Sequence, residues 1–361
     1  MNAIDDYSRE FTLLGKHVIK CELTAYLDAK FNPEKLEKAR MKAAADSERS
    51  FVDDHKKMIN MMRSGHLVKK SNKGKYSDDT ISQYERMRER WEECAADLKS
   101  GFVLSYDMTI DHFRNMVNWM IKKEYSQNTM YNIVNNLGIY LRYSHGEGFH
   151  SNEVYKHREF SIPQENSDAI APSYKEVLAL YNTPFNLENE ERARDLFVFG
   201  CFLALRVKDL SRINNYKLVG DVFEMNTSKT GTKVIIPCHW LAREIYEKYN
   251  GLMPVFHRQT LARILARICE SSKVIKGNKL IAITKAGRKV EKYYKRSELI
   301  TPHSMRRFFA TWMYRDLRRQ PREIMPITGH ETEDSFFKYI KIELEDNAKE
   351  ILSLPEFKKP S

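Results

Sequence analysis

The sequence predicts a mainly α-helical protein with a small β-hairpin or sheet, built as a helical domain followed by an α+β domain. Three observations carry this prediction. Apolar residues recur at helical spacing through residues 77–155. A switch to two-residue alternation follows Gly220. Between these regions, residues 156–172 contain Pro163 and Pro172 without an apolar period, which is typical of a linker.

The composition is that of a basic protein that is expected to bind a polyanion. With 60 Lys and Arg against 49 Asp and Glu, the 361-residue chain carries a formal charge of +11, which favours nucleic acid or an anionic membrane surface. A membrane is the poorer expectation because the longest apolar run, Leu196–Leu205, is about half of the roughly 20 residues that span a bilayer. Met1–Glu10 lacks the apolar region of a secretory signal, so we expect a cytoplasmic, nucleoid-associated protein. The five cysteines form no C-x-x-C pair, which indicates reduced thiols and no zinc site.

Residues 1–75 are expected to form a helical and basic segment ahead of the first domain. Glu34–Met62 carries an apolar stripe at helical spacing. The run that follows, Arg63–Lys75, holds five basic residues, Lys69 and Lys70 among them, and no acid. This run is either a solvated linker or an arm that follows DNA phosphates.

Residues 76–155 are expected to form a compact helical domain. Three helices are predicted here: the first is capped by Ser77 or Asp78, the second by Thr109, and the third begins near Ser126–Thr129. Their apolar stripes have the 3.6-residue period of buried faces and are assigned to the core. The polar faces hold candidate contacts to the phosphates and base edges of DNA: Lys122, Lys123, Asn128, Asn132 and Arg142.

The second domain, residues 173–361, is expected to begin with a helix after Ser173. An apolar helix at Arg192–Leu205 then forms the centre of its core, and Arg206 follows directly. Two interpretations of Arg206 stand level. It offsets the negative end of the helix dipole, an effect of about 0.3–1 kcal/mol. Alternatively, oriented by Asp209, it presents a preorganised fork to a phosphate.

The alternating stretch predicts two strands, Val222–Asn226 and Lys233–Pro237, joined by a turn at Ser228–Gly231. This pattern places Lys229 at the tip of a hairpin. The side chain is there either as a solvated charge or to reach a neighbouring site and donate a proton.

Helices are predicted next at residues 240–249 and 259–271, and a strongly basic segment follows them. Nine basic residues and a single acid, Glu291, lie between Lys273 and Arg296. This density exceeds what solubility requires, and the interspersed tyrosines are consistent with contacts to a nucleic-acid backbone. The candidate DNA contacts here are Arg288, Lys289 and Lys292.

The segment Thr301–Tyr339 concentrates residue types that suit chemistry on a phosphate. Pro302 is expected in the first turn of a helix, with His303 and Arg306 three residues apart on one face. The same helix is expected to continue into the core through four apolar residues: Phe309, Ala310, Met313 and Leu317.

A second helix in this segment is expected at Pro321–Ile327, with Gly329 as its C-terminal stop. His330 follows the glycine, and Tyr339 lies nine residues further on. Each of these features alone is a weak signal. Their order along the chain is the stronger one.

Taken in order, these residues resemble the tyrosine recombinase (phage integrase) family, most closely the integrases of conjugative transposons and temperate phages. The matching phrases are ALRVKDL (Ala204–Leu210), SKTG (Ser228–Gly231), PHSMR (Pro302–Arg306) and ITGHE (Ile327–Glu331). The resemblance implies that residues 173–361 are the catalytic domain and residues 76–155 a SAM-like core-binding domain, the two forming a C-shaped clamp on DNA. Residues 1–75 match least, where larger integrases carry an arm-site DNA-binding region.

The resemblance also implies six catalytic residues: Arg206, Lys229, His303, Arg306, His330 and Tyr339. Tyr339 would attack a phosphodiester as the nucleophile and become joined to the 3′ phosphate. Arg206 and Arg306 would balance the charge on the non-bridging oxygens, and His330 would donate a further hydrogen bond. Lys229 would protonate the leaving 5′ oxygen.

In the same scheme His303 would orient the phosphate and assist proton transfer. Because the bond energy is kept in the phosphotyrosine, no cofactor and no metal are expected. The implied partners are double-stranded DNA and further copies of the chain, as a homo-tetramer on DNA and a monomer in solution, together with accessory DNA-bending or directionality proteins. The alternatives are a DNA invertase or dimer resolvase, a type IB topoisomerase-like nicking enzyme, and a DNA-binding protein that does not cut.

Overall fold

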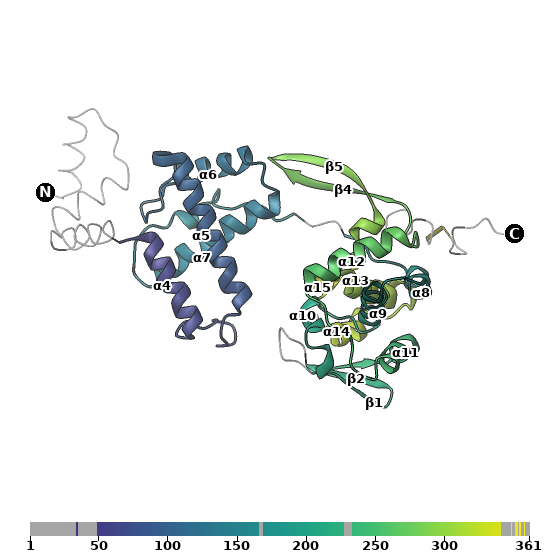
Figure 1. Cartoon of the computed structure of the whole chain (residues 1–361). Helices are drawn as coiled ribbons and strands as arrows, with labels where there is room; N and C mark the ends of the chain where they lie inside the picture. Colours follow the sequence, from purple (N-terminus) through teal and green to yellow (C-terminus); the bar gives the residue numbers. More distant parts are fainter. Residues whose placement is uncertain are drawn as a thin grey trace. The chain divides into compact units, whose positions relative to one another are not determined.

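The computed structural model describes residues 49–165, 169–226 and 233–340, together with positions 34, 348, 351, 352, 354 and 357. The chain divides into two compact units (Figure 1). The first is Met1–Asn166 with Ile283–Val290, and the second is Ser167–Ala282 with Glu291–Ser361. The predicted turn at Ser228–Gly231, with Lys229, lies outside the described residues. No helix in the described part of the chain has both the length and the apolar character to cross a membrane.

The first unit is helical, and its helices are α4 (Phe51–Ser64), α5 (Asp78–Leu98), α6 (Ile110–Lys122) and α7 (Gln127–Gly146). Three of these helices begin where the sequence predicts; α4 begins at Phe51, after the N-cap Ser50, inside the single long helix that was expected over Glu34–Met62. The side chains of Ser77, Thr109 and Ser126 each accept a hydrogen bond from a main-chain N–H three residues on; this selects Ser77 over Asp78, confirms Thr109 and makes Ser126 the N-cap of α7. The apolar faces of all four helices meet in one core around Trp91.

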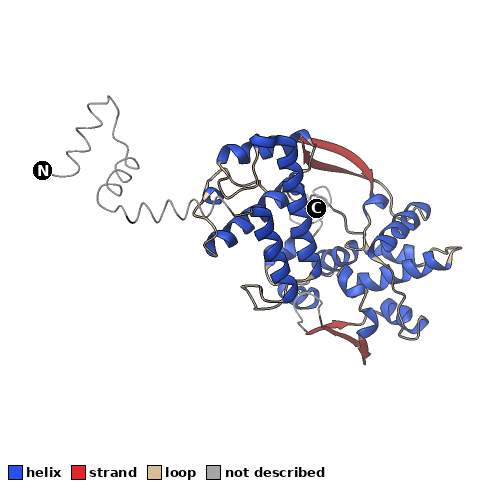
Figure 2. Ribbon diagram, turned by 60° about the vertical axis from the view of Figure 1, so that its left-hand side comes forward, coloured by secondary structure: helices blue, strands red, loops and turns tan. Residues whose placement is uncertain are grey.

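A long hairpin, β4 (Asn278–Lys285) and β5 (Arg288–Lys295), contributes its tip to the first unit. Figure 2 shows the two strands as one extended ribbon. At the tip, the main-chain N–H of Ala286 donates to the carbonyl of Tyr125 at 3.2 Å. The carboxylate of Glu165 accepts from the main-chain N–H of Thr284 at 3.0 Å. These strands were not predicted from the sequence.

The second unit is built around α9 (Glu188–Phe202), whose residues from Ala193 onward are all buried. The helix contacts four others, namely α8 (Tyr174–Tyr181), α11 (Trp240–Lys248), α12 (Arg258–Ser271) and α13 (Ser304–Thr311). Its central place in the core is as predicted. Its bounds differ, because the helix begins four residues earlier than expected and ends at Phe202 rather than Leu205.

A three-stranded antiparallel sheet lies next to these helices. Its strands run in the order β1 (Lys217–Val219), β2 (Val222–Asn226) and β3 (Lys233–Pro237). The two predicted strands have the expected bounds and pair antiparallel, while β1 was missed. Phe223 and Ile236 form a register pair that is fully buried under the sheet.

The C-terminal part of the second unit carries the short elements that hold four of the predicted catalytic residues, His303, Arg306, His330 and Tyr339. After α13 comes one π-helical segment, Trp312–Asp316, then α14 (Pro321–Thr328) and α15 (Glu333–Phe337). Two expectations were wrong here. The helix begins at Ser304, two residues after Pro302, and Leu317 is 43% exposed rather than part of the core, because the helix ends before it.

Candidate active site

Five of the six residues that the family resemblance singles out lie in the described part of the chain, and the structure brings them together around Tyr339. The ring of Tyr339 is 4.7 Å from that of His330 and 6.1 Å from that of His303, between centroids. The guanidinium carbon of Arg306 is 5.4 Å from the centre of the same ring. A cavity of about 220 Å³ opens beside it, lined by Arg206, Gly329, His330, Glu331, Thr332, Ser335 and Tyr339.

Arg306 is buried on α13, with 2% of its surface exposed. Its Nη1 donates a hydrogen bond to the carbonyl oxygen of Ala204 at 3.2 Å, while Nε and Nη2 have no hydrogen-bond partner among the residues described. Burial, followed by the neighbouring Arg206 charge, lowers the pKa of Arg306 to about 9. The group therefore stays positively charged at neutral pH. Tyr339 and the Asp209 carboxylate offset part of this lowering of the pKa. A buried guanidinium that donates a hydrogen bond to a neutral carbonyl can still accept an anionic ligand.

Arg206 lies in the segment before the short helix α10 (Val207–Leu210), as its N-cap residue. Nη2 donates to the carbonyl of Gly329 at 2.7 Å, and Nη1 is buried without a hydrogen-bond partner in the described ranges. Because α9 already ends at Phe202, Arg206 does not lie at the end of that helix, and its guanidinium binds the C-cap carbonyl of α14 instead. Its role as a phosphate fork stays a prediction. Asp209 acts on the main chain, since its Oδ2 accepts from the Arg206 amide at 3.3 Å.

The two carbonyl oxygens that hold these arginines belong to residues in the left-handed conformation. Gly329, the C-cap of α14, has φ of 62°, and Ala204, two residues after α9, has φ of 52°. Reversing the chain direction in this way turns each carbonyl toward a guanidinium. The conformation is natural for glycine but costs an alanine about 1–2 kcal/mol. Strain of this kind collects at functional sites.

His303 precedes α13 and is partly buried. Burial lowers its pKa, and the charges of Arg307, Arg258, Arg306 and Arg206 lower it further, so the ring is neutral at neutral pH. Arg258 and Arg307 were missed by sequence reasoning. Arg307 adjoins a predicted residue and could have been found by that position, whereas Arg258, at the start of α12, gives no local signal. Both add to the positive charge around His303.

Tyr339 lies two residues beyond α15, and local capping sets its position. The hydroxyl of Thr332 accepts from the main-chain N–H of Ser335 and fixes the start of this helix. The Tyr339 amide then donates to the carbonyl of Phe336 at 2.8 Å, and Phe336 is fully buried. The chain after α15 is thereby held against the core beside His330.

The arrangement suits a tetrahedral anion such as a phosphoryl group. Arg206 and His330 line one small cavity together with Tyr339, and the guanidinium group of Arg306 lies against the ring of the same tyrosine. Guanidinium forks bind phosphate oxygens well because their donors lie in a fixed plane. No group of three or more His, Cys, Asp or Glu side chains with metal-binding geometry occurs among the described residues.

Comparison with solved structures relates this architecture to known proteins. A lambda integrase fragment (75–356), bound as a dimer to a COC′ core site, matches with a TM-score of 0.54 and 15% identity over 78% of this chain and 97% of its own. The Tn1549 transposon integrase (residues 82–397), in complex with circular intermediate DNA, gives 0.54 and 12% over 84% and 99%. XerH recombinase on a difH substrate gives 0.53 and 12% over 76% and 79%. The chain has the tyrosine-recombinase fold. Neither a family model nor a curated protein sequence matches it.

Within the tyrosine-recombinase fold, the predicted DNA-contacting residues differ in what already binds them. The Asn128 amide is engaged, donating to the carbonyl of Glu165 and accepting from its amide. Lys123 pairs with Asp97 and Glu93. Lys69 is partly exposed, and the remaining candidates are exposed on the surface: Lys70, Lys122, Asn132, Arg142, Arg288, Lys289 and Lys292. Their contacts with DNA stay predictions.

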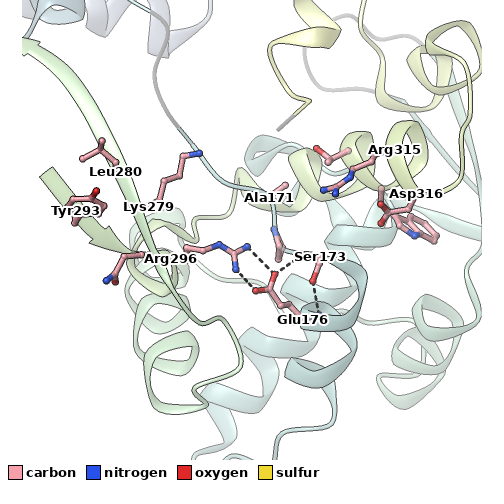
Figure 3. Close-up of a pocket in the computed structure, with 13 residues that line it drawn as sticks. Ala171, Ser173, Glu176, Lys279, Leu280, Tyr293, Arg296, Arg315 and Asp316 are labelled. Carbon is pink, nitrogen blue, oxygen red and sulfur yellow. Dashed lines mark hydrogen bonds and ion pairs between the residues drawn. The ribbon is translucent and has the colours of Figure 1, made fainter. Parts of the chain in front are cut away.

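A second, larger cavity in the same unit holds none of the predicted catalytic residues. It has a volume of about 820 Å³ and lies between α8, the β4–β5 hairpin and the segment after α13. In Figure 3, Arg296 points to Glu176, which binds it through both carboxylate oxygens. Tyr293 and Leu280 lie on the hairpin side. The charged pair in this cavity is already satisfied, unlike the arginines around Tyr339.

Proposed function

We propose that this chain is a site-specific DNA recombinase that cleaves and rejoins strands through a covalent 3′-phosphotyrosyl intermediate on Tyr339. The observation that carries the proposal is the pair of Arg306, which is buried, and Arg206, which is partly buried; both have buried guanidinium nitrogens without a hydrogen-bond partner among the described residues, close to that tyrosine. A DNA-binding protein that does not cut has no need of two such cations next to a phenol. The burial of Arg306 costs stability that a bound phosphate would return.

The chemistry follows from the positions of these groups. Tyr339 attacks the scissile phosphorus, its O–P bond forms, and the bond to the 5′ oxygen breaks. Arg206 and Arg306 bind the non-bridging oxygens, where charge gathers in the transition state. His303 and His330 complete the set around the phosphate. Lys229 is proposed as the group that protonates the 5′ oxygen, on the family resemblance alone.

The proposed biological role is integration and excision of a mobile element or phage. The lambda and Tn1549 proteins whose folds match this chain are integrases, and one lambda integrase structure is a tetramer bound to a Holliday junction. By analogy, we propose that this chain binds double-stranded DNA and assembles as a tetramer on it. The XerH match favours a resolvase as the second candidate, since that protein is bound to a difH substrate.

A covalent-capture experiment tests the proposal without knowledge of the target site. The purified chain is incubated with a library of nicked duplexes of randomised sequence, the mixture is denatured, and DNA that remains attached to protein is recovered and sequenced. Because a nick lets the short 5′ fragment diffuse away, the phosphotyrosine cannot be reversed and accumulates. We expect attached DNA from the wild-type chain and none from Tyr339→Phe.

Tyr246→Phe is the matched control, since Tyr246 packs against Phe199 and Phe223 and does not line the site. It should yield as much attached DNA as the wild type. Adducts that persist in Tyr339→Phe, or map to Tyr293 or Tyr314, would contradict the site assignment. DNA binding without any adduct would identify a non-cutting protein, whereas adducts with plasmid relaxation but no recombinants would identify a topoisomerase-like enzyme.

A further inference from the structure

Thr328, the last residue of α14, is buried against the histidine of the site. Only 1% of its surface is exposed. Its hydroxyl lies 2.8 Å from Nδ1 of His330, 3.1 Å from the carbonyl oxygen of Ile324 and 3.4 Å from that of Met325. One hydroxyl group therefore contacts three polar atoms, although it has one hydrogen to donate.

The position of that hydrogen follows from the chemistry of the partners. Carbonyl oxygens accept hydrogen bonds and never donate them, and a threonine in a helix commonly donates to the carbonyl four residues earlier. With its hydrogen on the Ile324 oxygen, the Thr328 hydroxyl meets His330 through a lone pair. The short contact to His330 then requires the hydrogen to be on Nδ1. A neutral imidazole that carries its hydrogen on Nδ1 has a bare Nε2.

We propose that Thr328 is a positioning residue that fixes the tautomer of His330. Neutral His330 then presents Nε2 as a hydrogen-bond acceptor, and only the protonated ring presents an Nε2–H donor to a phosphoryl oxygen. The proposal rests on the proposed function for its meaning, because it concerns how this site binds phosphate. It refines the simple donor role that the family resemblance implies for His330.

The consequence is a proton-linked phosphate site. The charged and titratable groups around the ring come from several elements: Arg206, His303, Arg306, Glu331 and Tyr339. The arginines keep their charge across the neutral range, and the lowered pKa of His303 leaves that ring neutral there. His330 is thus the histidine of the site whose protonation adds a donor. Phosphate should therefore bind more tightly to the protonated His330 ring than to the neutral one.

Nitrogen NMR of the full-length chain tests the tautomer directly. With ¹⁵N-labelled histidine, long-range proton–nitrogen spectra distinguish the two neutral tautomers, and His330→Asn identifies the signal. We expect Nδ1–H in the wild type and in Thr328→Ser. In Thr328→Val, which has the same shape but no hydroxyl, we expect Nε2–H to appear. A wild-type ring that carries Nε2–H, or a tautomer unaffected by Thr328→Val, would overturn the proposal.

Inorganic phosphate serves as the functional probe. Affinity measured at about pH 6 and about pH 8 should fall severalfold with rising pH in the wild type and in Thr328→Ser. It should change less in Thr328→Val, whose neutral ring can donate. Equal pH dependence in all three proteins would count against the proposal. These measurements need no DNA cleavage, so a failed covalent capture would sink the proposed function and leave the tautomer result standing.

Discussion

At the scale of single residues, two left-handed positions decide where the cations of the site lie. Ala204 and Gly329 each follow a helix and each turn a carbonyl oxygen to one arginine. The guanidinium planes are thereby set before any ligand arrives, and the remaining donors stay available. Such preorganisation matters because a guanidinium group binds phosphate better than a mobile lysine only while its planar donors are correctly oriented.

Gly329→Ala tests this arrangement. A side chain in the left-handed region should lower the free energy of unfolding by about 1–2 kcal/mol, and the shifted carbonyl should release Arg206 and weaken phosphate binding. Gly220→Ala is the matched control, because Gly220 has φ of 59° and nothing within 4 Å of the added carbon. Urea unfolding and phosphate titration measure the two effects. We expect a similar loss of stability in both variants and weaker binding only in Gly329→Ala; equal binding would show that the carbonyl does not hold the arginine.

At the scale of elements, the site depends on how closely α13 packs on α9. Gly200 lies at that contact, where an added Cβ would be 2.2 Å from Sδ of Met305, which is fully buried. A glycine in a helix interior costs about 1 kcal/mol relative to alanine. Its presence here is explained by the space it leaves for α13, the helix that carries Arg306 and begins after His303.

Gly200→Ala should therefore destabilise the second unit by about 1–3 kcal/mol through overpacking, and it should displace α13 and reduce covalent capture. Met305→Ala alone leaves a cavity and should cost about 2–5 kcal/mol. In the double variant, the truncated side chain at position 305 leaves room for the methyl group added at position 200. We expect the combined loss of unfolding free energy, measured in urea, to be smaller than the sum by at least about 0.5 kcal/mol. Simple additivity would mean that the helices do not compete for this space.

The elements that the sequence predicted well are those whose signals are local. Ser77, Thr109 and Ser126 are caps that act within three residues, and the β2–β3 alternation reflects one buried face. The β4–β5 hairpin was missed because nearly every residue of β5 is exposed, so no alternation marks it. Ala204 was missed because nothing in an alanine signals a left-handed backbone.

In the candidate active site, too, the residues with a sequence signal were predicted and those without one were missed. The order of its motifs along the chain pointed to the arginines, histidines and tyrosine, five of which the structure brings together. The contribution of Arg258 depends on how α12 folds back toward His303, which no local pattern encodes. The role of Thr328 depends on which atoms its hydroxyl meets, and that is visible only in the folded chain.

At the scale of the whole molecule, the basic residues behind the net charge of +11 differ in whether an acidic side chain already binds them. Lys123 is neutralised by acidic neighbours on α5, and Arg296 is bound by Glu176. The exposed cations of the hairpin, Arg288, Lys289 and Lys292, lie on a strand whose side chains face solvent almost throughout. Cations in such a position are suited to following a nucleic-acid backbone.

The contrast between cations held by acidic neighbours and exposed cations on the hairpin predicts how DNA binding should respond to salt. Each phosphate contact adds about 0.9 to the slope of log affinity against log salt concentration, because binding releases the counterion. Replacing Arg288 and Lys292 by alanine should lower the slope by up to about 2. The Thr284 and Ala286 contacts of the tip remain in place, so folding should be preserved. Fluorescence anisotropy with a duplex at several salt concentrations gives the slope.

Lys123→Ala is the matched control, because its ammonium group already lies 3.0 Å from Asp97. A lysine that must give up an acidic partner to reach a phosphate gains little from doing so, and its removal should leave the slope nearly unchanged. If instead Lys123→Ala lowers the slope as much per residue as the hairpin variant, the basic hairpin is not a preferred contact. The excess charge would then act as a diffuse field, which raises association rates without marking a binding surface.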